Sequence, residues 1–99
     1  MYDMNNLGKL KAMEAVTPEI MQAFRVFDAA AFGEGALSVK MKELIAVAVA
    51  LTTQCPYCIE IHAKKAKAAG ASDAELAEAA WVAAAIRAGG AVTHATHAI

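Results

Sequence analysis

The chain has 99 residues, 59% of them hydrophobic, and a formal net charge of −1 at pH 7. A nearly neutral chain without a basic stripe gives no reason to expect a nucleic-acid partner. The longest unbroken apolar run, Leu44 to Leu51, is far shorter than the roughly 20 residues that span a bilayer, so we expect no membrane segment.

Helix signals dominate the first third of the chain. Spaced apolar residues within positions 1–15 predict a short helix there. Thr17, Pro18 and Glu19 then supply an N-cap, a proline at the first helical position and an early acidic residue. We expect this second helix to end at Gly33. Its apolar stripe consists of Ile20, Phe24, Phe27 and Ala31.

The next predicted helix is the most apolar one. Ser38 opens it, and it runs from Val39 to about Thr53. Its middle alternates as a strand would, but its alanines favour a helix, because alanine is the best helix former. Since Leu44 to Leu51 is apolar on all sides, this helix must be surrounded on every side.

Two further helices follow. One begins at the two cysteines and ends at Gly70, and the other starts with a capping box at Ser72 and runs to Arg87, before Gly89 and Gly90. The tail AVTHATHAI predicts a last short helix. No linker, repeat or strand–helix alternation is visible, so the sequence predicts an all-α fold with one domain over residues 1–99.

The composition also predicts self-association. Four or five alanine-rich helices cannot cover a helix that is apolar all round and also bury Trp81, Val82 and Ile86. We therefore expect an oligomer with the helix at 73–88 in its contacts.

The only two cysteines form a CxxC pair, TTQCPYCIEIH. Pro56 at the first helical position makes Cys55 the N-cap and Cys58 the third helical residue. Both sulfurs then lie where free N–H groups favour negative charge, the setting in which CxxC thiols have lowered pKa values. His62 lies four residues after Cys58, on the same face, and can take its proton. The placement suits a redox dithiol with a built-in base.

Two other interpretations of the cysteine pair stay open at this point. Cys55, Cys58 and His62 could bind zinc, with His94 or His97 as the fourth ligand. The two thiols could also be ordinary buried side chains. A c-type haem motif is excluded, because no histidine directly follows the second cysteine.

Glu43 is a further candidate. It lies twelve residues before Cys55, in the most apolar helix. It either marks the exposed start of that helix or points inward. In the second case the turn around Thr53 and Gln54 could bring it towards His62, whose imidazole it would orient.

The amino end, MYDMNNLGKLK, has no apolar core of the kind that a secretory signal carries. This favours a cytoplasmic location. In that compartment a CxxC pair is more often catalytic or metal-binding than a structural disulfide.

The spacing of Glu43, Cys55, Cys58 and His62, within GALSVKMKELIAVAVALTTQCPYCIEIHAKKAKAAGAS, resembles the alkylhydroperoxidase D-like branch of the carboxymuconolactone decarboxylase family. The resemblance covers about residues 17–93. It implies an all-helical bundle that assembles as a homotrimer or homohexamer.

The same resemblance implies an oxidoreductase with peroxiredoxin-type activity. Such an enzyme reduces hydroperoxides, or exchanges electrons with a dithiol or protein-thiol reductant. Carried over by position, Cys58 attacks the peroxide, Cys55 is the resolving thiol, and His62 and Glu43 form a proton relay. No metal or organic cofactor is implied.

This chain departs from alkylhydroperoxidase D in two respects. Tyr57 stands where that protein has a histidine before the second cysteine, and the chain is a single short copy. Both departures favour a slower thiol–disulfide role over strong peroxidase activity. The decarboxylase branch generally lacks the CxxC pair, so lactone decarboxylation is the weaker alternative.

Several other side chains have simpler explanations. Tyr57 either lines the site or packs against neighbours, and Trp81 is expected in the core or in a subunit interface. His94 and His97 are expected on the surface or in an interface.

Overall fold

The structure is a computed structural model that describes residues 2–99. Over these residues it contains α-helices and short 3₁₀ helices and no strand, which confirms the predicted all-α class. The chain divides into two compact units, and the boundary falls between Val39 and Lys40. Within the described part of the chain, no helix is long and apolar enough to cross a membrane.

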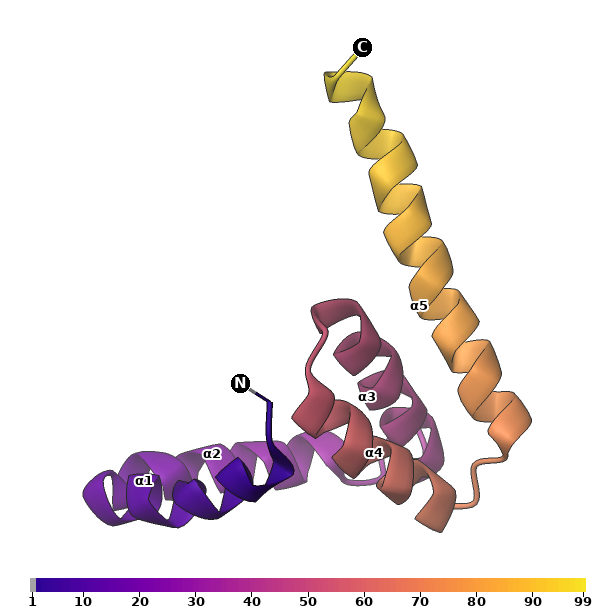
Figure 1. The fold of residues 1–99 in the computed structure, drawn as a ribbon. Coiled ribbons are helices and arrows are strands. Elements are labelled where there is room, and N and C mark those ends of the chain that lie inside the picture. The colour runs from indigo at the N-terminus through magenta and orange to yellow at the C-terminus, as the bar shows by residue number, and fades with distance from the viewer. Residues whose placement is uncertain (1) are drawn as a thin grey trace. The chain divides into compact units, whose positions relative to one another are not determined.

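The first unit is a helical hairpin that follows a 3₁₀ turn. The 3₁₀ helix η1 spans Met4–Lys9, α1 spans Leu10–Val16, and α2 spans Pro18–Phe32 (Figure 1). The helix predicted within residues 1–15 is therefore α-helical only from Leu10. Asp3 caps the start of η1, because its side chain accepts a hydrogen bond from the Asn5 N–H at 2.9 Å.

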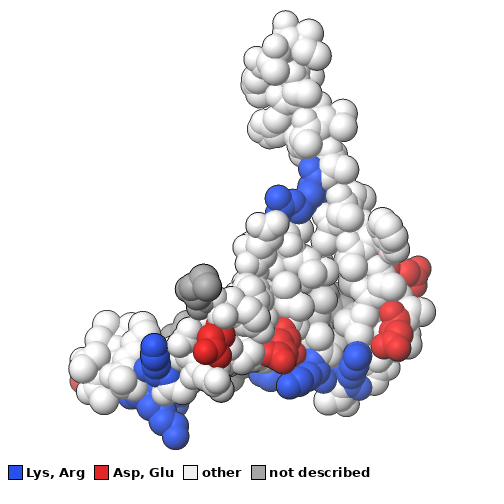
Figure 2. Space-filling model, in the orientation of Figure 1, with Lys and Arg blue, Asp and Glu red and all other residues white. Residues whose placement is uncertain are grey.

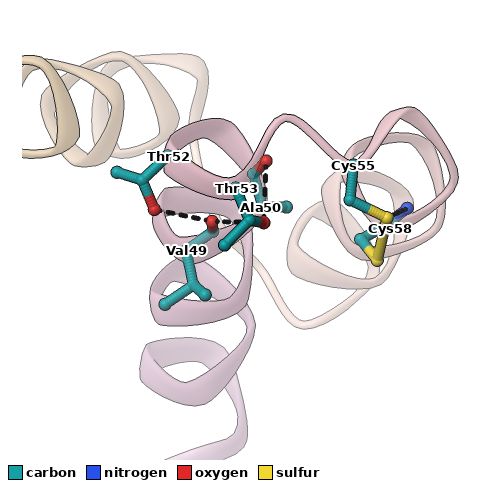
Figure 3. The surroundings of a disulfide bond; sticks show 6 residues. All are labelled: Val49, Ala50, Thr52, Thr53, Cys55 and Cys58. Carbon is teal, nitrogen blue, oxygen red and sulfur yellow. Dashed lines mark hydrogen bonds between the residues drawn. A yellow bond between two sulfur atoms is a disulfide. The ribbon is translucent and has the colours of Figure 1, made fainter.

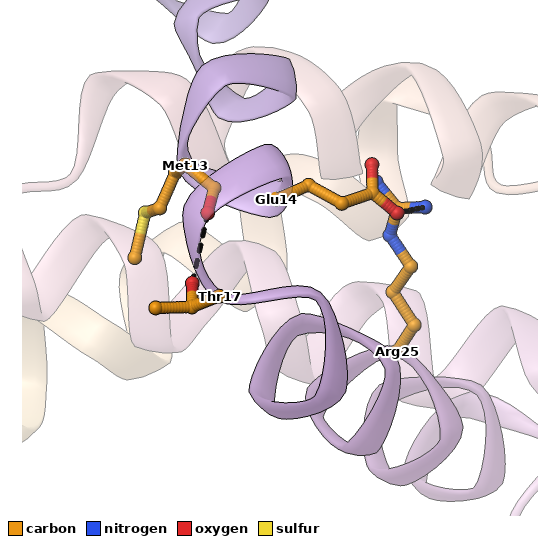
Figure 4. Close-up of polar contacts among 4 residues, drawn as sticks. All are labelled: Met13, Glu14, Thr17 and Arg25. Carbon is orange, nitrogen blue, oxygen red and sulfur yellow. Dashed lines mark hydrogen bonds and ion pairs between the residues drawn. The ribbon is translucent and has the colours of Figure 1, made fainter.

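Two side-chain contacts join α1 to α2. Arg25 donates from both terminal nitrogens to the Glu14 carboxylate, at 3.0 Å each (Figure 4). Thr17 lies at the N-cap of α2 as predicted, but its hydroxyl donates to the Met13 carbonyl at 2.8 Å and does not cap α2. The predicted stripe of α2 remains outside the core, since Ile20, Phe24 and Phe27 are all exposed.

The second unit contains three helices and the site. α3 spans Val39–Thr53, α4 spans Pro56–Ala68, α5 spans Asp73–His94, and a 3₁₀ turn, η2, covers Ala95–His97. Figure 1 shows α3 and α4 as an antiparallel pair. Their small core joins both helices to the start of α5. It consists of Leu44, Ala66 and Ala71, with Leu76 and Ala79 packed against them.

α5 lies beside α3 and runs in the same direction. The Lys40 ammonium of α3 is 2.9 Å from the Glu75 carboxylate of α5. Twelve residues further along both helices, Arg87 donates to the Thr52 carbonyl oxygen at 2.5 Å. These two contacts fix the register of α5 against α3 at both ends of α3.

The predicted end of the fourth main helix at Arg87 is wrong. α5 continues through Gly89 and Gly90 to His94, and the tail adds only the η2 turn. A helical glycine costs only about 1 kcal/mol relative to alanine, which is too little to stop a long alanine-rich helix. Neither glycine takes a positive φ, and no proline follows. A glycine pair without a C-cap conformation is therefore not a stop signal here.

Candidate active site

The connection between α3 and α4 positions the two cysteines at the start of α4. α3 ends at Thr53, and the next residue, Gln54, has a φ of 56°, in the left-handed region that non-glycine residues rarely adopt. The Cys55 N–H then donates back to the Ala50 carbonyl at 3.0 Å. This hydrogen bond closes the helix end in the way of a Schellman motif, and it reverses the chain so that α4 starts at once.

Side chains also bind carbonyl groups near the end of α3. The hydroxyls of Thr52 and Thr53 donate to the Val49 carbonyl, at 2.7 and 2.9 Å (Figure 3). Arg87 supplies the guanidinium that binds the Thr52 carbonyl. A helix C-terminus carries unpaired carbonyls and partial negative charge, so a cation there is favourable.

The two cysteines occupy the predicted cap positions of α4. Cys55 is the N-cap, Pro56 is at N1, and Cys58 is at N3. The Cys58 N–H donates to the Cys55 sulfur at 3.3 Å. The two sulfurs form a disulfide across a Cα–Cα distance of 5.3 Å. The backbone at this helix start therefore holds the cysteines close enough to open and close one S–S bond.

Glu43 points inward, towards His62. Only 4% of its surface is exposed, and its Oε2 lies 2.6 Å from Nδ1 of His62. The exposed-start alternative for Glu43 is therefore wrong. A carboxylate that accepts from Nδ1–H leaves the proton-accepting role of the imidazole to Nε2. This pairing fixes the orientation of the ring.

The cysteines and the Glu43–His62 pair are connected through α4. Cys58 and His62 are four residues apart within one regular helix, which places them on a common face. The surroundings are partly enclosed, since Cys55, Cys58 and His62 all have intermediate exposure. The arrangement offers a dithiol at a helix amino end, with a carboxylate-paired imidazole one turn further along.

The predicted zinc set is not assembled. Across residues 2–99, no group of three or more His, Cys, Asp and Glu side chains lies close enough to hold a metal ion. His94 and His97 pair with each other, with ring centroids 5.6 Å apart, at the end of α5 and in η2. They are therefore not fourth ligands of the cysteine pair in this structure.

The structure also gives the positions of Tyr57 and Trp81. Tyr57 lies half-buried in the first turn of α4, between the cysteines. Trp81 does not lie in the core of this chain, because 74% of its surface is exposed. The alternative expectation, a subunit interface, stays a prediction.

The contact of Arg87 with the end of α3, next to the cysteines, was not predicted from the sequence. A signal was present, because Arg87 is the one Lys, Arg, Asp or Glu between Trp81 and the end of the chain. A lone cation near the end of such an apolar helix is a candidate for a specific contact, and in the structure its exposed guanidinium binds the end of α3.

Residues 18–99 match the family model described as "Carboxymuconolactone decarboxylase family". A Paracoccus denitrificans protein described as "protein 4 in cox locus" is 50% identical over 80 residues, which cover 81% of this chain and 72% of the relative. A Haemophilus influenzae protein is 47% identical over 49 residues, half of this chain and 43% of the relative.

Two solved structures are similar in both fold and sequence. A crystal structure of a Methanobacterium thermoautotrophicum protein has a TM-score of 0.78 and 43% identity, covering 83% of this chain and 92% of that one. A carboxymuconolactone decarboxylase family protein from Legionella pneumophila has the same TM-score and 35% identity, covering 83% of this chain and 73% of that one. The chain therefore belongs to the carboxymuconolactone decarboxylase family, as a member with a CxxC pair at its site.

Proposed function

We propose that this protein is a thiol-dependent oxidoreductase that reduces hydroperoxides, or exchanges electrons with thiol partners, through Cys55 and Cys58. The observation that carries the proposal is the joint placement of a disulfide-forming pair and a Glu43–His62 pair on one short helix and its neighbour. Such a pairing activates a thiol, because the imidazole accepts its proton and the carboxylate stabilises the resulting charge.

The oxidative half of the cycle uses Cys58 first. His62 takes the proton of the Cys58 thiol, and the thiolate attacks the outer oxygen of the hydroperoxide. The O–O bond breaks, Cys58 becomes a sulfenic acid, and the alcohol leaves with a proton returned by His62. The Cys55 thiol then attacks the Cys58 sulfur, which forms the disulfide and releases water.

The reductive half needs two electrons from outside the chain. A small dithiol or a protein with a CxxC pair attacks the disulfide as a thiolate, passes through a mixed disulfide, and leaves oxidised. We infer a reducing compartment such as the cytoplasm for this cycle, because such reductants are maintained there. No bound cofactor takes part in either half.

The proposal is tested by thiol titration of the reduced, metal-analysed protein before and after one equivalent of hydroperoxide. We expect both thiols to be lost together in the natural chain. Cys55→Ser should react once and stop at a sulfenic acid, because its resolving thiol is missing. Turnover should then be measured with a panel of dithiols as reductants.

Three results would count against the proposal. One equivalent of zinc held by the two thiols would favour a zinc-stabilised helical module. Thiols that survive excess peroxide would mark an inert pair. Decarboxylation of a lactone without any change in thiol content would favour the decarboxylase alternative.

We also propose that the protein works as a homotrimer or homohexamer, with the outer face of α5 buried against further copies. Trp81, Val82, Ile86 and Val92 are large apolar side chains of α5 that this chain leaves exposed. Figure 2 shows the carboxyl-terminal half of α5 almost entirely without charged atoms. A face without charges suits an identical face, because no charge has to be desolvated or paired.

The assembly is tested by sedimentation at micromolar concentration. We expect a species of three or six times the 10.3 kDa chain mass, and Ile86→Glu should dissociate it. A stable monomer of the natural chain at that concentration would contradict the assembly and leave the redox proposal intact.

A further inference from the structure

Arg87 binds the segment that carries the cysteines, although it lies 35 residues away from Thr52 in the sequence. Its Nη1 donates to the Thr52 carbonyl at 2.5 Å, a hydrogen bond that the positive charge strengthens. Thr52 is three residues before Cys55, and only Thr53 and Gln54 lie between them. The Thr52 peptide is therefore part of the short segment that positions Cys55.

The turn that follows has an unfavourable backbone conformation. Gln54 has a φ of 56°, and the left-handed region costs a residue with a side chain roughly 1–2 kcal/mol. Among residues 2–99 it is the one non-glycine residue with a positive φ. Such a conformation persists only where its surroundings hold it in place. The Cys55–Ala50 hydrogen bond holds one side of the turn, and Arg87 holds the other.

The need for this anchor differs between the two redox states. In the disulfide state the S–S bond itself keeps Cys55 beside Cys58. In the dithiol and sulfenic-acid states no covalent bond does so, and Cys55 stays in reach only as long as the turn keeps its shape. Whatever holds the turn therefore sets the effective concentration of the Cys55 thiol towards Cys58.

We propose that Arg87 is a positioning residue for the Cys55–Cys58 couple, acting through the α3–α4 turn. The inference rests on the proposed thiol–disulfide function and extends it to α5. Arg87 fixes the Thr52 peptide, the fixed peptide stabilises the left-handed Gln54, and the turn presents Cys55 to Cys58. The step that Arg87 favours is disulfide formation, in which the Cys55 sulfur attacks the Cys58 sulfenic acid and water is released.

A purely structural role makes a different prediction. If Arg87 only caps the carboxyl end of α3, its loss lowers the stability of both redox states equally, and the disulfide equilibrium does not move. If it positions Cys55, its loss penalises closure, and the equilibrium shifts towards the dithiol. The equilibrium constant against dithiothreitol therefore separates the two roles.

The experiment equilibrates the full-length protein with dithiothreitol buffers and counts free thiols. Arg87→Met keeps an unbranched apolar stem in place of the side chain and removes its donors, and Arg87→Lys restores one charged donor group. The matched control is Arg25→Met, which removes the other arginine, bound to Glu14 outside the site. Circular dichroism and a urea titration monitor the folding of each variant.

We expect Arg87→Met to lower the equilibrium constant for disulfide formation about tenfold, which corresponds to a reduction potential about 30 mV higher. Arg87→Lys should recover most of that loss, and Arg25→Met should match the natural chain. The decisive variant adds Gln54→Gly to Arg87→Met. Glycine adopts a positive φ without penalty, so the turn should form without its anchor, and the constant should return to within about threefold of the natural value.

Two outcomes would overturn the inference. If the equilibrium constant for disulfide formation is unchanged in Arg87→Met, Arg87 only caps the carboxyl end of α3. A lowered constant that Gln54→Gly does not rescue would mean that Arg87 acts as a charge and not through the turn. If Arg87→Met alone does not fold, Arg87→Gln, which is shorter than arginine and uncharged, takes its place in the same comparison. If the natural protein forms no disulfide with peroxide, the proposed function fails, whereas the inference fails only on the dithiothreitol constants.

Discussion

The two connections of the second unit, α3 to α4 and α4 to α5, have the same backbone design and different residues. Each helix ends with one residue at positive φ, Gln54 at 56° after α3 and Gly70 at 96° after α4. In each, the N–H that follows closes back on the helix, on Ala50 at 3.0 Å and on Ala66 at 2.9 Å. Glycine is the residue that this position favours, and glutamine is not.

The helix starts that follow are also alike in geometry. Ser72 caps α5 by accepting the Glu75 N–H at 3.1 Å, and the Glu75 side chain completes a capping box. Cys55 caps α4 by accepting the Cys58 N–H at 3.3 Å. Both cysteines thus occupy the two positions, N-cap and N3, at which α5 has its serine and glutamate.

The two connections differ in how closely their residues follow the local preferences of helix ends. The α4–α5 connection uses the residues that helix ends prefer, namely glycine, serine and glutamate. The α3–α4 connection has a strained glutamine, sulfur caps and an arginine from a distant helix. Departures from local preference that cluster in this way are typical of functional sites.

The largest effect should come from the group that has no counterpart at the other connection, the Glu43–His62 pair. Glu43→Gln keeps the size of the side chain but replaces the carboxylate that contacts Nδ1 of His62 with a neutral amide. We expect peroxide turnover to fall about ten- to a hundredfold, with a smaller effect on thiol alkylation. Initial rates with saturating dithiol measure this.

The matched control for that variant is Glu60→Gln, which removes a carboxylate of α4 that lies 4.0 Å from Lys64 on the surface. Its turnover should stay near that of the natural chain. Equal losses in both variants would indicate a general charge effect and would remove Glu43 from the proposed relay.

A medium effect should come from exchanging the residues at positive φ. Gly70→Ala should destabilise the fold by about 1–2 kcal/mol, because alanine is strained in the left-handed region. The added Cβ would meet no atom within 4 Å, so the cost lies in the backbone alone. Gln54→Gly should be neutral or stabilising by up to about 1 kcal/mol. Urea unfolding of both oxidised variants tests the pair, and a clear loss of stability in Gln54→Gly would mean that the glutamine side chain supports the turn.

The smallest effect concerns the capping box of α5. The Ser72 backbone N–H that Glu75 accepts, and then the Lys40 ammonium, lower the pKa of the Glu75 carboxyl below its usual 4.5. A lowered pKa favours the ionised carboxylate in the fold, so this stabilisation is complete above about pH 4.5 and is lost as the pH falls below it. Melting curves of Glu75→Gln should depend less on pH below 4.5 than those of the natural chain. Glu78→Gln, on the same helix, should keep the natural dependence.

Much of this arrangement was predictable from sequence, since it depends on local rules. Pro56 fixed both cysteines at the start of α4, and Ser72 with its glutamate fixed the start of α5; the structure confirms both. The end of α5 was predicted wrongly, because Gly89 and Gly90 resemble a stop signal and only the whole helix shows that they are tolerated.

The contacts between distant segments were harder to predict. Glu43 could equally have faced solvent, because periodicity gives no direction to a helix that is apolar on all sides. Arg87 was missed, because its partner is a backbone carbonyl, a group that every residue has and no sequence pattern marks. Trp81 was expected in the core or an interface, and its exposure in this chain depends on packing that composition does not specify.

We propose that the thiol activated by this site is Cys58. Two features of the structure favour different cysteines. The Cys58 N–H that reaches the Cys55 sulfur would stabilise a thiolate on Cys55. His62, one turn along α4, would stabilise one on Cys58. The most direct test is the rate of alkylation at pH 6.5 in the reduced Cys55→Ser and Cys58→Ser variants. We predict that Cys55→Ser is alkylated as fast as the natural protein, and that Cys58→Ser is alkylated at least about tenfold more slowly. We also predict that the His62→Gln substitution lowers the alkylation rate of the natural protein. A fast-reacting thiol that persists in Cys58→Ser would contradict the account and make Cys55 the nucleophile.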